Sequence, residues 1–153
     1  MDRIEKIREY VDDILLRMND NDERRCAYVH LYGVSQVCAM LAIKRNENVE
    51  LAVIAGMLHD IYSYANMDSF DHAHKGAEMA RELLEKSGIF SIQERNRICT
   101  AIYNHSDKDS AHDPLSELMK DADVMQHYLY NPLLEVKPQE MERLKSLRSE
   151  FDF

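Results

Sequence analysis

Helix-breaking residues are scarce in this sequence, which has four glycines and three prolines among 153 residues. Such a composition suits long helices joined by short connections. Cysteines are also few: Cys26, Cys38 and Cys99 are odd in number and form no Cys-x-x-Cys pair. We therefore expect them to be small core residues in a reducing cytoplasm rather than parts of a disulfide framework.

Long apolar runs are lacking as well, since none approaches the roughly 20 residues of a membrane span. The first six residues are charged and amphipathic, unlike a signal peptide. Positive charge is in deficit, with 19 Lys and Arg against 28 Asp and Glu, a net charge of −9. We expect a cytoplasmic protein that binds neither membrane nor nucleic acid. A small phosphorylated substrate remains compatible, because a bound metal ion supplies local positive charge.

Apolar residues recur at helical spacing along most of the chain, and no segment alternates as a strand does. We expect an all-α, single-domain protein spanning 1–153. Asn48, Gly88, the Ser91/Glu94 capping box and Pro114 mark helix ends. The expected helices are 2–18, about 22–45, 49–60, 73–86, 91–105, 114–130 and a final amphipathic helix after 138, with loops at 61–71 and 106–113. In the final helix we expect Met141, Leu144, Leu147 and Phe151 to share one side.

His59 and Asp60 end the apolar run Leu51–Leu58, which is an unusual finish for a buried helix. Burying an unpaired carboxylate is costly, so it needs a compensating partner. A metal ion can be that partner, because imidazole and carboxylate are both good ligands for Zn, Fe and Mn. The alternative for this dipeptide alone is a polar helix end at the surface.

Two further histidines lie on apolar helix faces. His30 shares its face with Val34, Val37 and Leu41, and His105 shares its face with Ile98, Ala101 and Ile102. Either histidine alone could be a satisfied core residue. Together with His59 and Asp60, they are better explained by one shared polar centre.

These residues and their flanks resemble the HD-domain metal-dependent phosphohydrolase superfamily. The resemblance covers roughly residues 26–130 and rests on the order His30, His59-Asp60, Asp123. The matching segments are His-Leu-Tyr-Gly-Val at 30–34, Gly-Met-Leu-His-Asp-Ile at 56–61 and Lys-Asp-Ala-Asp-Val at 120–124. The resemblance implies an HD-type helical bundle in which His30, His59, Asp60 and Asp123 hold one metal ion. The segments outside the core would be an N-terminal helix within 1–18 and a C-terminal helix within 138–153.

Two more segments resemble the branch of this superfamily with two metals. His-Ala-His-Lys-Gly-Ala at 72–77 is similar to a motif of HD-GYP phosphodiesterases and of HD-type diadenosine tetraphosphate hydrolases, and Ile-Tyr-Asn-His-Ser at 102–106 is similar to a motif of the latter. The resemblance implies a second ion held by His72, His105 and a bridging Asp60. Imidazole and carboxylate donors suit Fe, Mn or Zn better than Mg.

The choice between His72 and His74 follows from helical geometry, because positions two apart lie about 200° apart and cannot face one metal. Gly76 follows His72 on the same face and allows close approach of another backbone or of the metal centre. His74 aligns with charged residues on the opposite side. We assign the ligand role to His72, although a surface-loop histidine is the alternative.

The chain also departs from the superfamily. Many members carry a lysine shortly after His-Asp that contacts substrate phosphate, whereas here Ile-Tyr-Ser-Tyr-Ala follows at 61–65. The Gly-Tyr-Pro motif of HD-GYP proteins is missing, which disfavours a cyclic-dinucleotide role. Lys75 and Lys108 lie near the expected ligands and are our candidates for contacting phosphate, although solvated surface lysine is the commoner outcome.

The expected function is hydrolysis of a phosphomonoester or phosphoanhydride of a small, nucleotide-like substrate by a metal-activated water. Asp60 and His59 would be the catalytic centre of such a site, with two divalent transition-metal ions as cofactor. Two alternatives stay open: an HD-fold di-iron oxygenase, and a catalytically silent HD domain that binds a nucleotide or metal. The sequence does not predict the oligomeric state.

Overall fold

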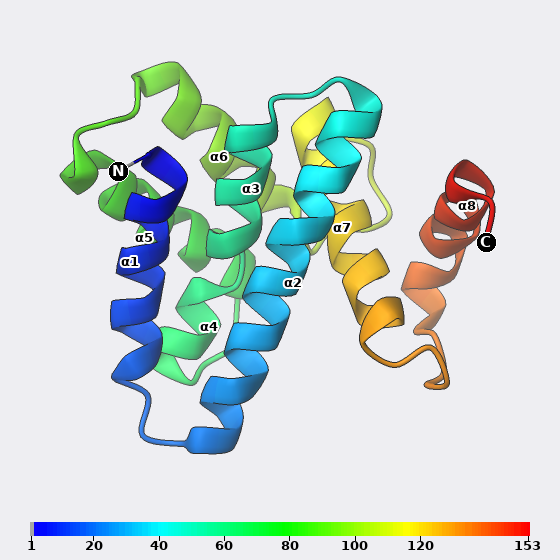
Figure 1. Ribbon diagram of the computed structural model, residues 1–153, viewed down its shortest axis with the longest axis horizontal. Helices are drawn as coiled ribbons and strands as arrows, with labels where there is room; N and C mark the ends of the chain where they lie inside the picture. The colour runs from blue at the N-terminus through cyan, green and yellow to red at the C-terminus, as the bar shows by residue number, and fades with distance from the viewer. Residues whose placement is uncertain (1) are drawn as a thin grey trace.

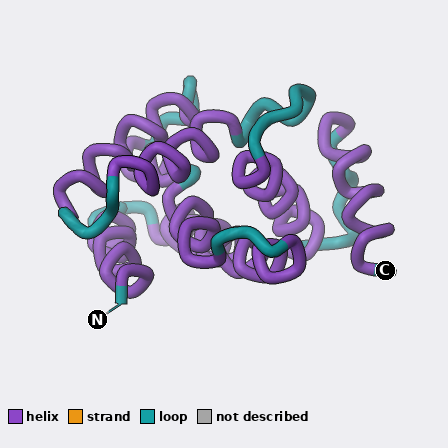
Figure 2. Tube along the Cα trace, turned by 90° about the horizontal axis from the view of Figure 1, so that it is seen from above, coloured by secondary structure: helices purple, strands orange, loops and turns teal. Residues whose placement is uncertain are grey.

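The computed structural model describes residues 2–153, and the regular secondary structure in that range is entirely helical (Figure 1). This confirms the predicted all-α, single-domain class. Figure 2 shows the same helices from above, joined by short loops. The elements are α1 (Arg3–Leu16), α2 (Asn21–Arg45), α3 (Val49–Leu58), α4 (Ile61–Asn66), α5 (His72–Ser87), α6 (Ile92–Asn104), α7 (Pro114–Tyr130), the 3-10 helix η1 (Pro138–Glu140) and α8 (Met141–Phe151).

The predicted helix-end signals are confirmed. The Asn48 side chain accepts a hydrogen bond from the backbone N–H of Leu51 at 3.0 Å and so caps α3. Ser91 and Glu94 form the reciprocal capping box of α6. Gly88 ends α5 with φ of 68°, a left-handed conformation that glycine adopts without steric cost. Pro114 is the first residue of α7.

The prediction of a loop over 61–71 is wrong for its first half, because α4 occupies Ile61–Asn66. The segment is rich in aromatic residues, which have only modest helix propensity. Its fully buried Ile61 and the packing of α4 against α5 stabilise the helix instead. Asp60 therefore lies at a joint between two helices, with φ −112° and ψ 13°.

Helix α2 is the centre of the fold. It packs against both α3 and α7, which flank it in Figure 1. α5 and α6 pack against each other, and α6 also contacts α3 and α7. α8 packs mainly against α7, at the far end of the molecule from α1. The core thus surrounds α2 and α3, the two helices that carry His30 and lead into His59.

By length and composition alone, α2 could cross a membrane, with a mean hydropathy of 1.5 in its most apolar window. Of that window 44% is buried inside the protein. Leu31, Val34, Cys38 and Leu41 from this helix are fully buried in the core. The apolar character of α2 is therefore that of a core helix.

Helices α2 and α3 come close together at Gly56. A Cβ added to Gly56 would lie 2.7 Å from the Cα and 2.9 Å from the backbone nitrogen of Ser35. Both distances are shorter than real Cβ contacts allow. Glycine at this position is therefore what lets the two helices approach backbone to backbone.

One predicted core residue, Cys26, lies on the surface instead. Cys26 is exposed near the start of α2, whereas Cys38 and Cys99 are buried as expected. Met141 is 56% exposed, because α8 has only just begun there and packs through Leu144 and Leu147.

Candidate metal centre

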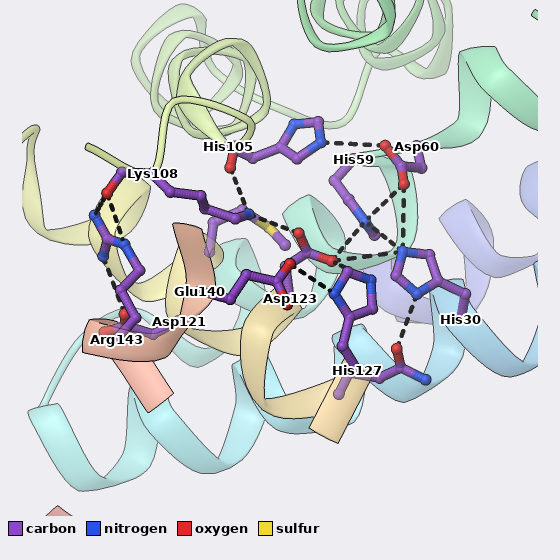
Figure 3. Close-up of polar contacts among 12 residues, drawn as sticks. His30, His59, Asp60, His105, Lys108, Asp121, Asp123, His127, Glu140 and Arg143 are labelled. Carbon is purple, nitrogen blue, oxygen red and sulfur yellow. Dashed lines mark hydrogen bonds and ion pairs between the residues drawn. The ribbon is translucent and has the colours of Figure 1, made fainter. Parts of the chain in front are cut away.

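The six predicted ligands converge on one place from five helices and the joints between them. His30 lies within α2 and Asp123 within α7, whereas His72 opens α5. His59 follows the last residue of α3, and His105 follows the last residue of α6. Asp60 completes the set from the α3–α4 joint. Figure 3 shows five of these six side chains pointing toward one another.

His30 and His59 lie beside one oxygen of Asp60, Oδ2, and Asp123 lies beside the two histidines. The Nε2 atoms of His30 and His59 are 3.0 Å apart, and each lies 3.3 Å from Asp60 Oδ2. Asp123 Oδ1 lies 3.6 Å from His30 Nε2 and 3.9 Å from His59 Nε2. These are separations that atoms bound to one transition-metal ion have from one another.

A second group surrounds the other oxygen of the same carboxylate. Asp60 Oδ1 lies 3.1 Å from His105 Nε2 and 3.4 Å from His72 Nε2. The three ligand atoms are close enough to hold one ion. Asp60 therefore faces a different histidine group with each oxygen, which is the arrangement a carboxylate needs to bridge two ions.

The hydrogen bonds of the rings indicate which nitrogen faces the centre. His59 Nδ1 lies 2.8 Å from the Gly56 carbonyl, and His105 Nδ1 lies 2.7 Å from the Ile102 carbonyl. A carbonyl only accepts, so Nδ1 carries the hydrogen and donates. The same holds for His72, whose Nδ1 lies 3.1 Å from the carbonyl of residue 69. In a neutral ring the Nε2 lone pair then points inward, which is the second-sphere arrangement of metal-binding histidines.

The residues fit a metal because their polar atoms are otherwise uncompensated. Asp60 Oδ1 and Asp123 Oδ1 are buried, and neither finds a hydrogen-bond donor of suitable geometry among residues 2–153. Lone pairs of Nε2 atoms and carboxylate oxygens facing one another repel unless a cation lies between them. Divalent transition-metal ions match both the donor types and this need.

The carboxylates of the centre are held ionised. Burial alone would raise the pKa of Asp60, but the surrounding His59, His105 and His30 lower this pKa well below its usual value. Burial would likewise raise the pKa of Asp123, and the neighbouring Lys108 charge lowers it. Both side chains are therefore charged ligands at neutral pH.

The structure brings Lys108, but not Lys75, to the cluster. Lys108 Nζ lies 2.6 Å from Asp123 Oδ2 and donates to the His105 carbonyl at 2.7 Å. Its own carbonyl accepts from Arg143 of α8 at 2.9 Å (Figure 3). Lys75 instead lies 3.3 Å from Asp68. Lys108 thus orients a ligand, with its charge already engaged by Asp123.

His72 and His74 point to different places. His72 faces Asp60, as described, whereas His74 Nδ1 lies 2.9 Å from Asp71 and its ring stacks on Tyr103 at 3.9 Å. A Cβ at Gly76 would lie 3.2 Å from the His59 carbonyl oxygen. The close approach inferred for Gly76 is therefore with the backbone of the α3 end.

We expect His72→Ala to lose the second ion and His74→Ala to retain it, because only His72 directs Nε2 at Asp60. Metal content per chain, measured by elemental analysis after identical loading, checks this. The reverse pattern would make His74 the ligand.

Sequence reasoning missed His127. It follows Asp123 by four positions, so it lies one helical turn further along the same face of α7. Its Nε2 lies 3.4 Å from Asp123 Oδ1, and its Nδ1 lies 3.0 Å from Glu140 Oε1. The i, i+4 spacing was a usable signal, whereas nothing local indicates Glu140.

A cavity of about 650 Å³ opens beside the centre. Three residues of the cluster line it, namely His30, Asp60 and His127. The remaining wall combines aromatic rings, apolar side chains, two cations and two carboxylates, including Tyr64, Tyr128, Tyr130, Val29, Val136, Arg25, Lys137, Glu135 and Glu140. Its volume is that of a pocket for a small molecule.

The model of one protein family, the HD domain, matches residues 27–127. The chain belongs to the HD domain family. This match contains all six predicted ligands and lies within the core expected at 26–130. The same fold is found in the crystal structure of a predicted HD superfamily hydrolase from an uncultured Thermotogales bacterium. The TM-score is 0.65 at 22% identity, over 96% of this chain and 87% of that one.

Proposed function

We propose that this HD-domain protein is a metal-dependent phosphohydrolase with two ions in its centre. The observation that carries the proposal is Asp60, whose two oxygens face two separate histidine groups. His30, His59 and Asp123 would complete one ligand set, and His72 with His105 the other. Fe, Mn and Zn are the ions that these donors favour.

The chemistry that such ions supply when bound is activation of a water and neutralisation of phosphoryl charge. The protein's residues do the rest. Asp60 and His59 form the centre of the site, and second-sphere hydrogen bonds keep the histidine rings in position. Lys108 forms an ion pair with Asp123. Its positive charge would still lie beside the centre when a phosphate enters.

The cavity supports a small, nucleotide-like substrate. Tyr64, Tyr128 and Tyr130 offer surfaces for a planar group, and Arg25 and Lys137 offer charge for phosphates. The net charge of −9 disfavours long nucleic acid as a partner. We propose that the protein acts in the cytoplasm on a small phosphorylated compound.

We expect protein purified without chelator to contain close to two transition-metal ions per chain and to release phosphate from members of a phosphatase and phosphodiesterase panel. The assays would compare Mn, Fe and Zn, with chelated protein as the control. Oxygen consumption with an organic substrate would indicate an oxygenase instead. Tight ligand binding without turnover under every metal would indicate a binding domain. Absence of bound metal, with no rise in melting temperature on adding it, would refute the centre itself.

A further inference from the structure

His127 resembles the predicted ligands in the placement of its ring, with Nδ1 facing an acceptor and Nε2 facing a carboxylate of the centre. Its Nδ1 faces a buried acceptor, Glu140, whose side chain is 7% exposed. A carboxylate held there accepts the Nδ1 hydrogen, so in the neutral ring the Nε2 lone pair points the other way. That direction is toward Asp123 Oδ1, at 3.4 Å. A carboxylate behind a histidine is also the common second sphere of a metal-bound imidazole.

The position of His127 relative to His30 also favours a role for His127 as a metal ligand. The two rings are nearly parallel, at 15°, with centroids 5.3 Å apart. Both Nε2 atoms lie near Asp123 Oδ1, at 3.4 Å for His127 and 3.6 Å for His30. One ligand atom from each of these three residues lies within 4.8 Å of the others. A single cation at their centre would satisfy all three.

The alternative to a metal ligand is a structural role for His127. A protonated His127 could bridge the carboxylates of Glu140 and Asp123 as a plain ion pair. Asp123 is already paired, however, because Lys108 lies 2.6 Å from its Oδ2. The free oxygen, Oδ1, is the one that both His30 and His127 approach.

We propose that His127 is a further ligand of the ion that His30 and Asp123 hold, positioned by Glu140. This inference rests on the metal centre of the proposed function. His127 also lines the cavity, so it coordinates on the side from which substrate enters. Glu140 lies beyond residues 27–127, which the family matches. A segment outside the family core therefore supplies the second sphere of this ligand.

The test uses the full chain stripped of metal and titrated with Co(II), whose visible absorption reports the ligand set. His127→Ala should weaken binding of one ion by more than 100-fold and alter its absorption spectrum, while the other ion binds as in the wild type. Glu140→Gln should weaken the same ion by about 10- to 100-fold, the usual effect of a second-sphere change. His74→Ala, an exposed histidine outside the cluster, is the matched control and should bind both ions normally.

Three outcomes would count against the proposal. If His127→Ala binds both ions with wild-type affinity and spectrum, His127 is a structural ion-pair residue. If wild-type protein binds two ions but Glu140→Gln changes neither, Glu140 does not position a ligand. If wild-type protein binds no Co(II), the proposed metal centre fails together with this inference. Should His127→Ala not fold, His127→Gln, which keeps a polar side chain of similar length, answers the same question.

Discussion

Asp60→Ala is expected to abolish hydrolysis and to remove both ions. Each Asp60 oxygen faces a different histidine group, so one truncation removes a ligand from both ions at once. We expect turnover to fall by far more than the ~10- to 100-fold that second-sphere changes cause. Steady-state assays on the best panel substrate, with elemental analysis of the same sample, measure both effects.

Stability measurements on Asp60→Ala distinguish the contribution of bound metal from the contribution of the Asp60 side chain to the fold. Each ion, present at 100 to 1,000 times its Kd, stabilises a folded protein by about 3 to 4 kcal/mol, and the variant should lose this increment for both ions. Comparing the two proteins without metal measures what Asp60 contributes to the fold itself through its contacts with His30, His59 and His105. Asp68→Ala, an exposed carboxylate beside Lys75, is the control. Retained activity in Asp60→Ala would overturn the mechanism.

Gly56→Ala is expected to have the largest effect on folding. The added Cβ would lie 2.7 Å from the Ser35 Cα, and neither backbone can yield without separating α2 from α3. Overpacking of this kind costs about 1–3 kcal/mol, and more where backbone must move. For a domain of this size that corresponds to a Tm lower by roughly 3–10 °C. Thermal unfolding followed by circular dichroism measures it.

The same substitution should also weaken metal binding. His30 and His59 are carried by the two helices that would separate, and the His59 ring donates to the Gly56 carbonyl itself. Gly88→Ala is a suitable control, since its φ of 68° strains any other residue while its Cβ would meet open space. That variant should lose stability without losing metal. Equal metal affinity in Gly56→Ala and wild type would show that the α2–α3 spacing does not set the ligand geometry.

Helix limits were predictable wherever a local signal marks them. Asn48, Ser91 and Pro114 act within a few residues of their own position, so their roles follow from sequence. The segment of α4 has no such signal, and its helix depends on burial of Ile61 and packing against α5. The spacing of Met141 predicts its side of α8 but not its burial, because a stripe shows which face is apolar and not how far along that face a partner extends.

The candidate centre was predictable in a different way. The resemblance to the HD superfamily indicated six ligands, and the structure brings these six side chains together. His127 was missed because its distinguishing partner, Glu140, is 13 positions away across a loop. Likewise, the pairing of Lys108 with Asp123 joins residues 15 positions apart. Contacts of this kind depend on how helices dock, which no local pattern encodes.

The hydrogen bonds behind the histidine rings imply that the two halves of the centre are ordered by different means. His59, His72 and His105 each donate to a carbonyl three residues earlier, within their own turn of chain. His30 and His127 depend on distant acceptors, Gln126 and Glu140. The half that contains His72 and His105 is thus oriented as soon as its helix ends form. In the half near the cavity, His59 is oriented locally, but His30 and His127 are oriented only once α7 and the chain leading into α8 are docked. Local opening of the C-terminal segment would therefore weaken ion binding in that half and spare the other half.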